Sequence, residues 1–354
     1  MRKRSGKRRG RRVEGRGPRA KRQEHSAERR DAIGAQPSAL SPQPYHVPVL
    51  VEPVVSFLLN ENARLIVDAT LGGGGHTAAL LAKGEAELRV IGIDADTEAL
   101  AAAQTRLQNE AIRCQFVHGN FRSLTHLLGP LGITSVDGLL ADLGVSSRQI
   151  DRPERGFSYM DDGPLDMRMN PDLPRTSRTA TAAEVLATLE ESELEHIFRE
   201  YGEEKFAGRI ARAIARRRLQ TPFERTHDLR RVVEQVVKGP HQIKSLARIF
   251  QALRIVVNAE LDALTEFLES ALQVLRPGGR LAVISYHSLE DRIVKQFFKA
   301  REKGCTCPPE FPVCVCGKKS QLSILTKKPL EAGAAEIAAN SRSRSARLRV
   351  AEKR

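Results

Sequence analysis

The stretch that decides the fold is Arg64-Leu-Ile-Val-Asp-Ala-Thr-Leu-Gly-Gly-Gly-Gly-His-Thr77. Its apolar run 65–67 predicts a buried parallel strand, which ends at Asp68. Four glycines follow, and the alanine- and leucine-rich run 78–82 predicts the start of a helix. Glycine lets the backbone turn sharply and lets a ligand approach it, beside the free N–H groups of a helix N-terminus. The stretch therefore predicts an α/β fold that binds a ligand at this turn.

The glycine turn alone leaves two ligand classes open. Gly73, Gly75 and Ala78 match the dinucleotide fingerprint G-x-G-x-x-G/A. The same turn also serves nucleoside cofactors that have no pyrophosphate, such as S-adenosylmethionine. The acidic residue at the strand end, Asp68, favours the second class, because a carboxylate accepts hydrogen bonds from ammonium and hydroxyl groups.

Two later segments repeat the pattern of an apolar strand that ends in an acid. They are 88–94, which ends at Asp94, and 136–142, which ends at Asp142. Another strand is expected at 113–117, where Cys114 is expected in the core. Ligands of open α/β sheets bind at the carboxyl ends of the strands. We therefore expect Asp68, Asp94 and Asp142 to converge on one crevice.

The composition indicates a globular protein that does not enter a membrane. Of 354 residues, 41% are hydrophobic, which is enough for a sizeable core. No run approaches the roughly 18 apolar residues of a membrane span, and no signal peptide is visible. We expect a cytoplasmic protein whose five cysteines are reduced.

Positive charge is concentrated at the N-terminus. The net charge is +14, and residues 1–30 hold 14 Lys and Arg against 3 Glu. With almost no large apolar residue, this arm cannot build a core of its own. Residues 1–44 are therefore predicted to be a disordered basic arm and linker, which either contacts nucleic acid or only keeps the protein soluble.

The strand and helix alternation stops after residue 150 and resumes near residue 274. Residues 151–178 are irregular and predict a functional lid, and helical patterns run from 181 to 257. One predicted helix, 202–218, aligns Arg209, Arg212 and Arg216 without paired acids, which points either to phosphate contacts or to a solvated face. Another, 246–264, carries a polar line made of Gln251, Arg254 and Asn258 that faces either the crevice or water.

The last part of the chain completes the α/β unit. A strand is predicted at 281–286, after a Pro-Gly-Gly turn, and closing antiparallel strands at 321–326 and 346–350. Cys305, Cys307, Cys314 and Cys316 form two C-x-C pairs, a weaker match to a zinc site than C-x2-C, so no metal is assigned.

Together these motifs resemble one family, the bacterial 16S rRNA cytosine-N4 methyltransferases. The resemblance runs from about residue 45 to the C-terminus. The matching motifs are Tyr45-His46 with Pro48–Leu50, Gly73–His76, Ile93-Asp94, Gly119–Phe121, Asp142–Ser147, Glu154–Met160, Gly163–Arg168, Gly202–Phe206, Phe250–Ala252 with Arg254-Ile255 and Asn258, Ile284–Arg292 and Ser341–Ser345.

The resemblance implies a Rossmann-like class I methyltransferase core that uses S-adenosylmethionine and carries an inserted all-helical domain. It implies core parts at 45–150 and 258–354 and an inserted lid and substrate-recognition domain at 151–257. The substrate would be a cytidine in the decoding region of 16S rRNA, within the small ribosomal subunit. The implied cofactor residues are Gly74, Gly75, His76, Asp94, Phe121, Asp142 and Gln149.

Asp142 is also the candidate catalytic residue. An acceptor after the fourth strand, either Asp142 or a backbone carbonyl in 143–147, would draw a hydrogen from the N4 amine, whose lone pair is otherwise delocalised into the ring. The aromatic side chain that holds the base is unassigned among Phe157, Tyr159 and Tyr286, and His287 is a candidate to receive the proton later. Three other functions remain open: a DNA amino-methyltransferase, a dinucleotide oxidoreductase and a ribosome-assembly factor that binds without catalysis.

Overall fold

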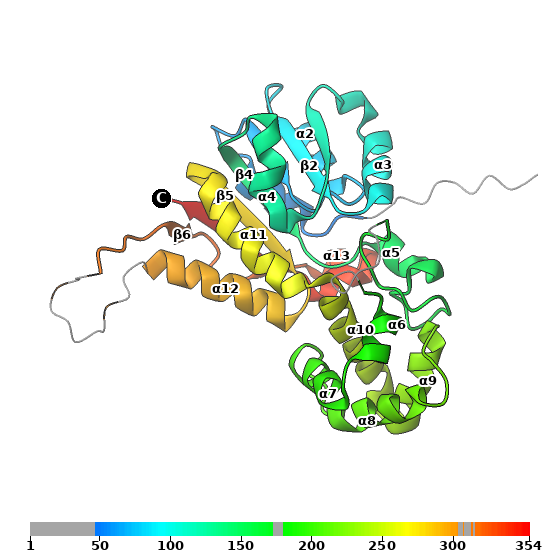
Figure 1. Ribbon diagram of the computed structural model, residues 1–354. Helices are drawn as coiled ribbons and strands as arrows, with labels where there is room; N and C mark the ends of the chain where they lie inside the picture. The colour runs from blue at the N-terminus through cyan, green and yellow to red at the C-terminus, as the bar shows by residue number, and fades with distance from the viewer. Residues whose placement is uncertain (1–46, 173–179, 304–306, 308–312, 314–315) are drawn as a thin grey trace, which may run out of the picture. The chain divides into compact units, whose positions relative to one another are not determined.

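The computed structural model describes residues 47–172, 180–303, 307, 313 and 316–354 (Figure 1). The predicted basic arm 1–44 lies outside the described residues, as do Cys305 and Cys314. Cys114 is buried, as predicted. No helix in the described part of the chain is both long enough and apolar enough to cross a membrane.

An eight-stranded sheet forms the centre of the protein, with strand order β3-β2-β1-β4-β5-β8-β6, and β7 pairs with β8. The pairs among β1 to β5 are parallel, and β8 is antiparallel to β5 and β6. The strands are β1 (Leu65–Asp68), β2 (Arg89–Asp94), β3 (Cys114–His118), β4 (Val136–Asp142), β5 (Leu275–Ser285), β6 (Leu322–Ile324), β7 (Leu330–Glu331) and β8 (Arg347–Lys353).

Side chains that alternate along the strands divide the core between the two faces of the sheet. Val67 and Leu139 pack on one face with apolar residues of α4, α11 and α12. Their neighbours Ile66 and Leu140 pack on the other face with α1 and α2. These helices, with α3 beside β2 and β3, are α1 (Val51–Leu58), α2 (Gly75–Lys83), α3 (Thr97–Arg106), α4 (Leu124–Leu128), α11 (Glu260–Val274) and α12 (Ser288–Lys303). Burial on both faces explains why the central strands are almost wholly apolar.

A helical unit with its own core interrupts the sheet between β4 and β5, and in Figure 1 it lies apart from the sheet. Its buried residues run from Phe157 to Val257. The last helix of the unit, α10, leads into α11, which returns to the sheet. The helices between β4 and α11 are α5 (Ser147–Asp151), α6 (Ala182–Thr188), α7 (Glu191–Glu200), α8 (Ala207–Arg218), α9 (Thr226–Val236) and α10 (Gln242–Asn258), and α13 (Ala334–Ala339) precedes β8.

Two predicted helices differ from the structure. The predicted helix 246–264 is two helices, α10 and α11, which meet at Ala259 in a left-handed conformation (φ 47°). The predicted helix 202–218 begins only at Ala207, because Glu203 also has a positive φ and interrupts the backbone pattern. Arg212 is paired with Glu191, so the predicted row of arginines without acids is wrong at that position.

The closing strands are confirmed, with one difference in β5. β6 and β8 pair antiparallel, as predicted for 321–326 and 346–350. The Pro277-Gly-Gly segment, predicted as a turn before the strand, lies within β5, which pairs with β4 through a register shift there. Gly278 has a φ of 77°, which its lack of a side chain permits.

Candidate active site

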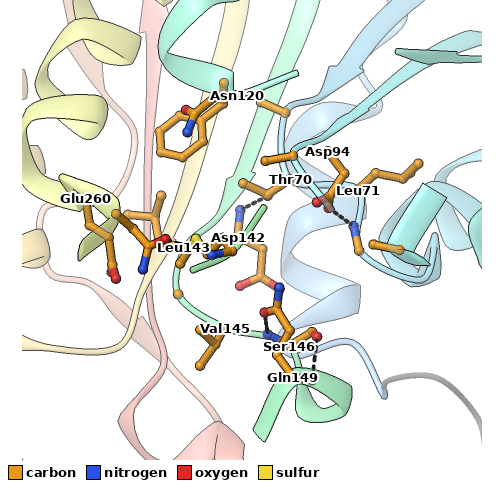
Figure 2. A pocket seen from close by; sticks show the side chains of 18 of the residues that line it. Thr70, Leu71, Asp94, Asn120, Asp142, Leu143, Val145, Ser146, Gln149 and Glu260 are labelled. Carbon is orange, nitrogen blue, oxygen red and sulfur yellow. Dashed lines mark hydrogen bonds between the residues drawn. The ribbon is translucent and has the colours of Figure 1, made fainter. Parts of the chain in front are cut away.

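A pocket lies where β1, β2 and β4 end, at the carboxyl edge of the sheet. Its walls come from the glycine turn, the end of β2, the loop after β4, and the junction of α10 with α11. In the view of Figure 2, Asp142 lies between Asp94 and Glu260, which mark two sides of the pocket. The pocket therefore extends from the glycine turn toward the helical unit.

The glycine turn is held in place by Asp94. Gly72 and Gly74 have φ values of 53° and 73°, a conformation that favours glycine. The backbone N–H of Gly72 donates to Oδ2 of Asp94 across 2.7 Å (Figure 2), and α2 begins three residues later at Gly75. The turn and the strand end thus form one rigid side of the pocket.

Asp94 keeps capacity to bind a ligand. Its Oδ1 accepts from the backbone N–H of Asp96 (2.8 Å), so each oxygen has one backbone donor and a further lone pair. Burial raises the pKa of Asp94 to about 6, although these two N–H groups oppose the shift. A carboxylate in this state can accept two hydroxyl groups, such as those of a ribose.

Asp142 ends β4 and lies against His76 and Tyr286. Its Oδ1 accepts from the Tyr286 hydroxyl (2.9 Å), and its Oδ2 lies 3.7 Å from Nδ1 of His76. Nε2 of His76 lies 2.8 Å from the carbonyl oxygen of Val49, and the N–H of Asp142 donates to Thr70 Oγ1. Burial raises the pKa of Asp142. A buried carboxyl of this kind accepts hydrogen bonds and takes up a proton readily.

The far side of the pocket contains two residues without a predicted role and one that was predicted to face either the crevice or water. Glu260 and Glu290 line it, and so does Asn258. The Asn258 side chain accepts from the N–H of Met169 (2.8 Å) and donates to the carbonyl of Met167 (2.8 Å), so it fixes the segment that leads to the helical unit.

Two signals in the sequence pointed toward this side. Glu290 lies in the motif 284–292, three residues after His287, and Asn258 lies on the predicted polar line of α10. Of the other members of that line, Gln251 bonds to the carbonyl of Tyr201, and Arg254 pairs with Glu260.

Comparison with known proteins identifies the fold family. A model of the MraW methylase family matches residues 43–354. The chain belongs to the MraW methylase family. This confirms the family predicted from the motifs.

Three relatives of this MraW-family methylase are ribosomal RNA small subunit methyltransferases H. The protein of Heliobacterium modesticaldum is 48% identical over 316 residues, which cover 87% of this chain and 98% of that protein. The protein of Heliobacterium mobile is 49% identical over 316 residues (87% and 99%). The protein of Carboxydothermus hydrogenoformans is 49% identical over 310 residues (87% and 97%).

The cofactor of this MraW-family methylase is S-adenosylmethionine, and the pocket fits it. The described residues that line the pocket include four carboxylates and no Lys or Arg. Such a lining attracts a cofactor that carries a net positive charge and repels a pyrophosphate. The family of the chain and the negative charge of the pocket both disfavour the alternative function of a dinucleotide oxidoreductase.

The predicted cofactor residues of the MraW-family chain are placed as follows. Six of the seven line the pocket: Gly75, His76, Asp94, Phe121, Asp142 and Gln149. Gly74 does not line it, because it faces α3, where an added Cβ would lie 3.0 Å from Leu107 Cδ1. The expectation that Asp68 joins the crevice is wrong: it is fully buried and accepts from Thr77 Oγ1.

The aromatic candidates for holding a base are also separated by the structure. Phe157 and Tyr159 belong to the core of the helical unit, where Tyr159 packs edge-on against Phe250. Tyr286 lines the pocket. Phe121 lines it as well and packs edge-on against Phe267, with ring centres 5.4 Å apart.

Proposed function

We propose that this chain transfers a methyl group from S-adenosylmethionine to the N4 amine of a cytidine in the decoding region of 16S rRNA, within the small ribosomal subunit. The observation that carries the proposal is the acid-lined pocket of a chain whose relatives, aligned over 87% of its length, are small-subunit rRNA methyltransferases. Its acceptor groups suit an amine substrate, because an amine donates hydrogen bonds to carboxylates.

The chemistry asks the protein for alignment and for a hydrogen-bond acceptor. S-adenosylmethionine, when bound, supplies a methyl group that is already activated. The protein must hold the amine in line with it. It must also draw on an N–H bond, because the N4 lone pair is delocalised into the ring. Asp142 is the proposed acceptor, since it lines the pocket and its Oδ2 lies 3.7 Å from Nδ1 of His76, while Oδ1 already accepts from the Tyr286 hydroxyl.

The proposed cofactor contacts follow from the walls of the pocket. Asp94 would accept the ribose hydroxyls, and the turn at Gly75 and His76 would approach the rest of the nucleoside. Phe121 would lie near the adenine. Gln149 supports this wall, because its Nε2 donates to Asp96 and its Oε1 accepts from Ser146 N.

The helical unit is the proposed substrate-recognition domain. A base in a folded RNA must leave its stack to enter a pocket of this kind. Asn258 connects the lid segment 167–169 to α10, so the lid can position the base relative to the helices. Arg216, exposed on α8, and the basic arm 1–44 are the proposed phosphate contacts.

The test is a methyl-transfer assay with radiolabelled S-adenosylmethionine. Purified protein is incubated with unmodified small ribosomal subunits, with naked 16S rRNA and with duplex DNA, and the labelled nucleoside is identified by mass. We expect N4-methylcytidine from the subunit. Label in DNA would instead identify a DNA amino-methyltransferase. Cofactor binding without any label would indicate a binding protein.

A further inference from the structure

Tyr286 links two carboxylates that line the same pocket. Its hydroxyl donates to Oδ1 of Asp142 across 2.9 Å, and its backbone N–H donates to Oε2 of Glu290, also across 2.9 Å. One residue thus sets the positions of both acids. The exocyclic amine of cytosine carries two N–H bonds, so a pocket with two carboxylates can accept both.

The two carboxylates have opposite surroundings. Burial raises the pKa of Asp142. Burial also acts to raise the pKa of Glu290, but its hydrogen bond and proximity to His287, together with the charge of Arg254, outweigh this and lower it. Nε2 of His287 lies 3.2 Å from Oε1 of Glu290, and both side chains are less than a tenth exposed. Two acids whose surroundings shift their pKa values in opposite directions take different roles in catalysis.

Two carboxylates of the pocket, Glu260 and Glu290, share the charge of one arginine, Arg254. The guanidinium of Arg254 bonds to both oxygens of Glu260, at 2.8 and 2.9 Å, so these two charges cancel. Glu260, His287 and Glu290 offer ligand atoms within 4.8 Å of one another, but the arginine already occupies Glu260, so a metal ion is disfavoured. Arg254 therefore offsets the charge of Glu260, the carboxylate to which it bonds.

In methyl transfer, a positive charge moves from the sulfur of the cofactor to the base that Glu290 would contact. The bond from N4 to the methyl carbon forms while the bond from that carbon to sulfur breaks, and its electron pair stays on sulfur. The positive charge passes to the base, and the amine then loses one proton. A fixed negative charge beside the amine stabilises this change most strongly in a pocket that excludes water.

We propose that Glu290 is a second catalytic carboxylate, which accepts one N4–H bond of the cytosine and stays ionised while Asp142 accepts the other and takes its proton. The proton leaves Asp142 for solvent after the product departs. His287 is a positioning residue, because it acts only through Glu290. The inference rests on the proposed function, since it requires an amine substrate.

Two variants separate charge from shape at this position. Glu290→Gln keeps the size of the side chain and its acceptor for the Tyr286 N–H, but removes the charge. Glu290→Asp keeps the charge and shortens the side chain. In single-turnover assays at saturating cofactor and subunit, we expect Gln to lower the rate about 100-fold or more and Asp to lower it about tenfold. A merely structural role predicts the reverse order. A Gln variant as fast as the Asp variant would overturn the proposal.

Binding measurements and a control complete the experiment. The dissociation constants of both variants for S-adenosylhomocysteine and for the small subunit should stay within about threefold of the wild-type values. The interaction that these variants lose stabilises the transition state of methyl transfer and not the bound ground state. Parallel losses of rate and of both affinities in the two variants would overturn the proposal in favour of a structural role. Glu269→Gln, which breaks an exposed pair with Arg301, should leave the rate unchanged. Failure of the wild-type protein to form N4-methylcytidine would count against the proposed function itself.

Discussion

Arg155 forms a buried ion pair with Asp96, in which Nη1 of the arginine lies 2.8 Å from Oδ2 of the aspartate. The same guanidinium donates through Nη2 to the carbonyls of Arg168 and Met169. Asp96 follows the end of β2, and residues 168 and 169 belong to the lid segment that Asn258 holds from the other side. The pair therefore joins the cofactor side of the pocket to the helical unit.

Loss of Arg155 should destabilise the protein far more than loss of a neighbouring surface arginine. Arg155→Ala leaves Asp96 buried without its counter-charge, so we expect the free energy of unfolding to fall by about 3–5 kcal/mol. Arg152→Ala is the matched control, because it removes an exposed pair with Glu98 (2.7 Å) and should cost less than about 1 kcal/mol. Urea unfolding measures both. Equal losses would mean that burial does not strengthen the Arg155 pair.

Cofactor affinity should depend on pH through Asp94. The pKa of Asp94 is raised from 3.8 to about 6, so without cofactor this group contributes stability below pH 3.8 that is lost as pH rises through 6. Binding has the opposite sign, because the ribose hydroxyls need the ionised carboxylate. We expect affinity for S-adenosylhomocysteine at pH 5 to be about tenfold below its value at pH 7.

Asp94→Asn is the control for this pH dependence. An amide does not titrate, so the variant should bind more weakly at pH 7 and lose this tenfold change between pH 5 and 7. Calorimetry at each pH measures the dissociation constant. An unchanged pH profile in the variant would assign the dependence to other carboxyls, such as Asp68 or Asp142, whose pKa values burial also raises.

Asp142→Ala should bind the cofactor weakly and transfer no detectable methyl group. Asp142 lines the pocket beside His76 and is the proposed acceptor of the amine proton. Tyr286→Phe removes only the hydroxyl that donates to Asp142, so we expect a smaller loss of rate, about tenfold. Calorimetry and single-turnover methyl transfer measure the two effects. Near-normal turnover by Asp142→Ala would remove Asp142 from both roles.

The local patterns of the sequence were sufficient to predict seven of the eight strands, all except β7. β1, β2 and β4 each carry an apolar run that ends in an acid, and their burial on both faces makes that signal strong. The same pattern was misleading at Asp68, because a strand end does not reveal whether its acid faces the pocket or the core. That choice depends on the neighbouring Thr77, which bonds to Asp68 across 2.8 Å.

The far side of the pocket was harder to predict because contacts distant in sequence create it. Glu260 pairs with Arg254, which is only six residues away in the sequence. It lines the pocket, however, only because the chain turns sharply at Ala259. Alanine favours helix, so the local pattern predicted one continuous helix there. Glu260 lines the pocket because of that turn, whereas Asn258, the last residue of α10, was already predicted to face either the crevice or water.

Ala259→Gly should stabilise the protein. The left-handed conformation at φ 47° costs a residue with a Cβ about 1–2 kcal/mol, and glycine removes this cost. Glycine also gives the unfolded chain more freedom, which lowers the free energy of unfolding by about 0.4–1 kcal/mol. The net gain in stability is roughly 0.5–1 kcal/mol. Ala101→Gly, at an exposed position inside α3, is the matched control and should destabilise by about 0.5–1 kcal/mol. Urea unfolding of both variants compares the signs. Destabilisation by both would mean that the junction of α10 and α11 carries no backbone strain, and the position of Glu260 would then owe nothing to a strained turn.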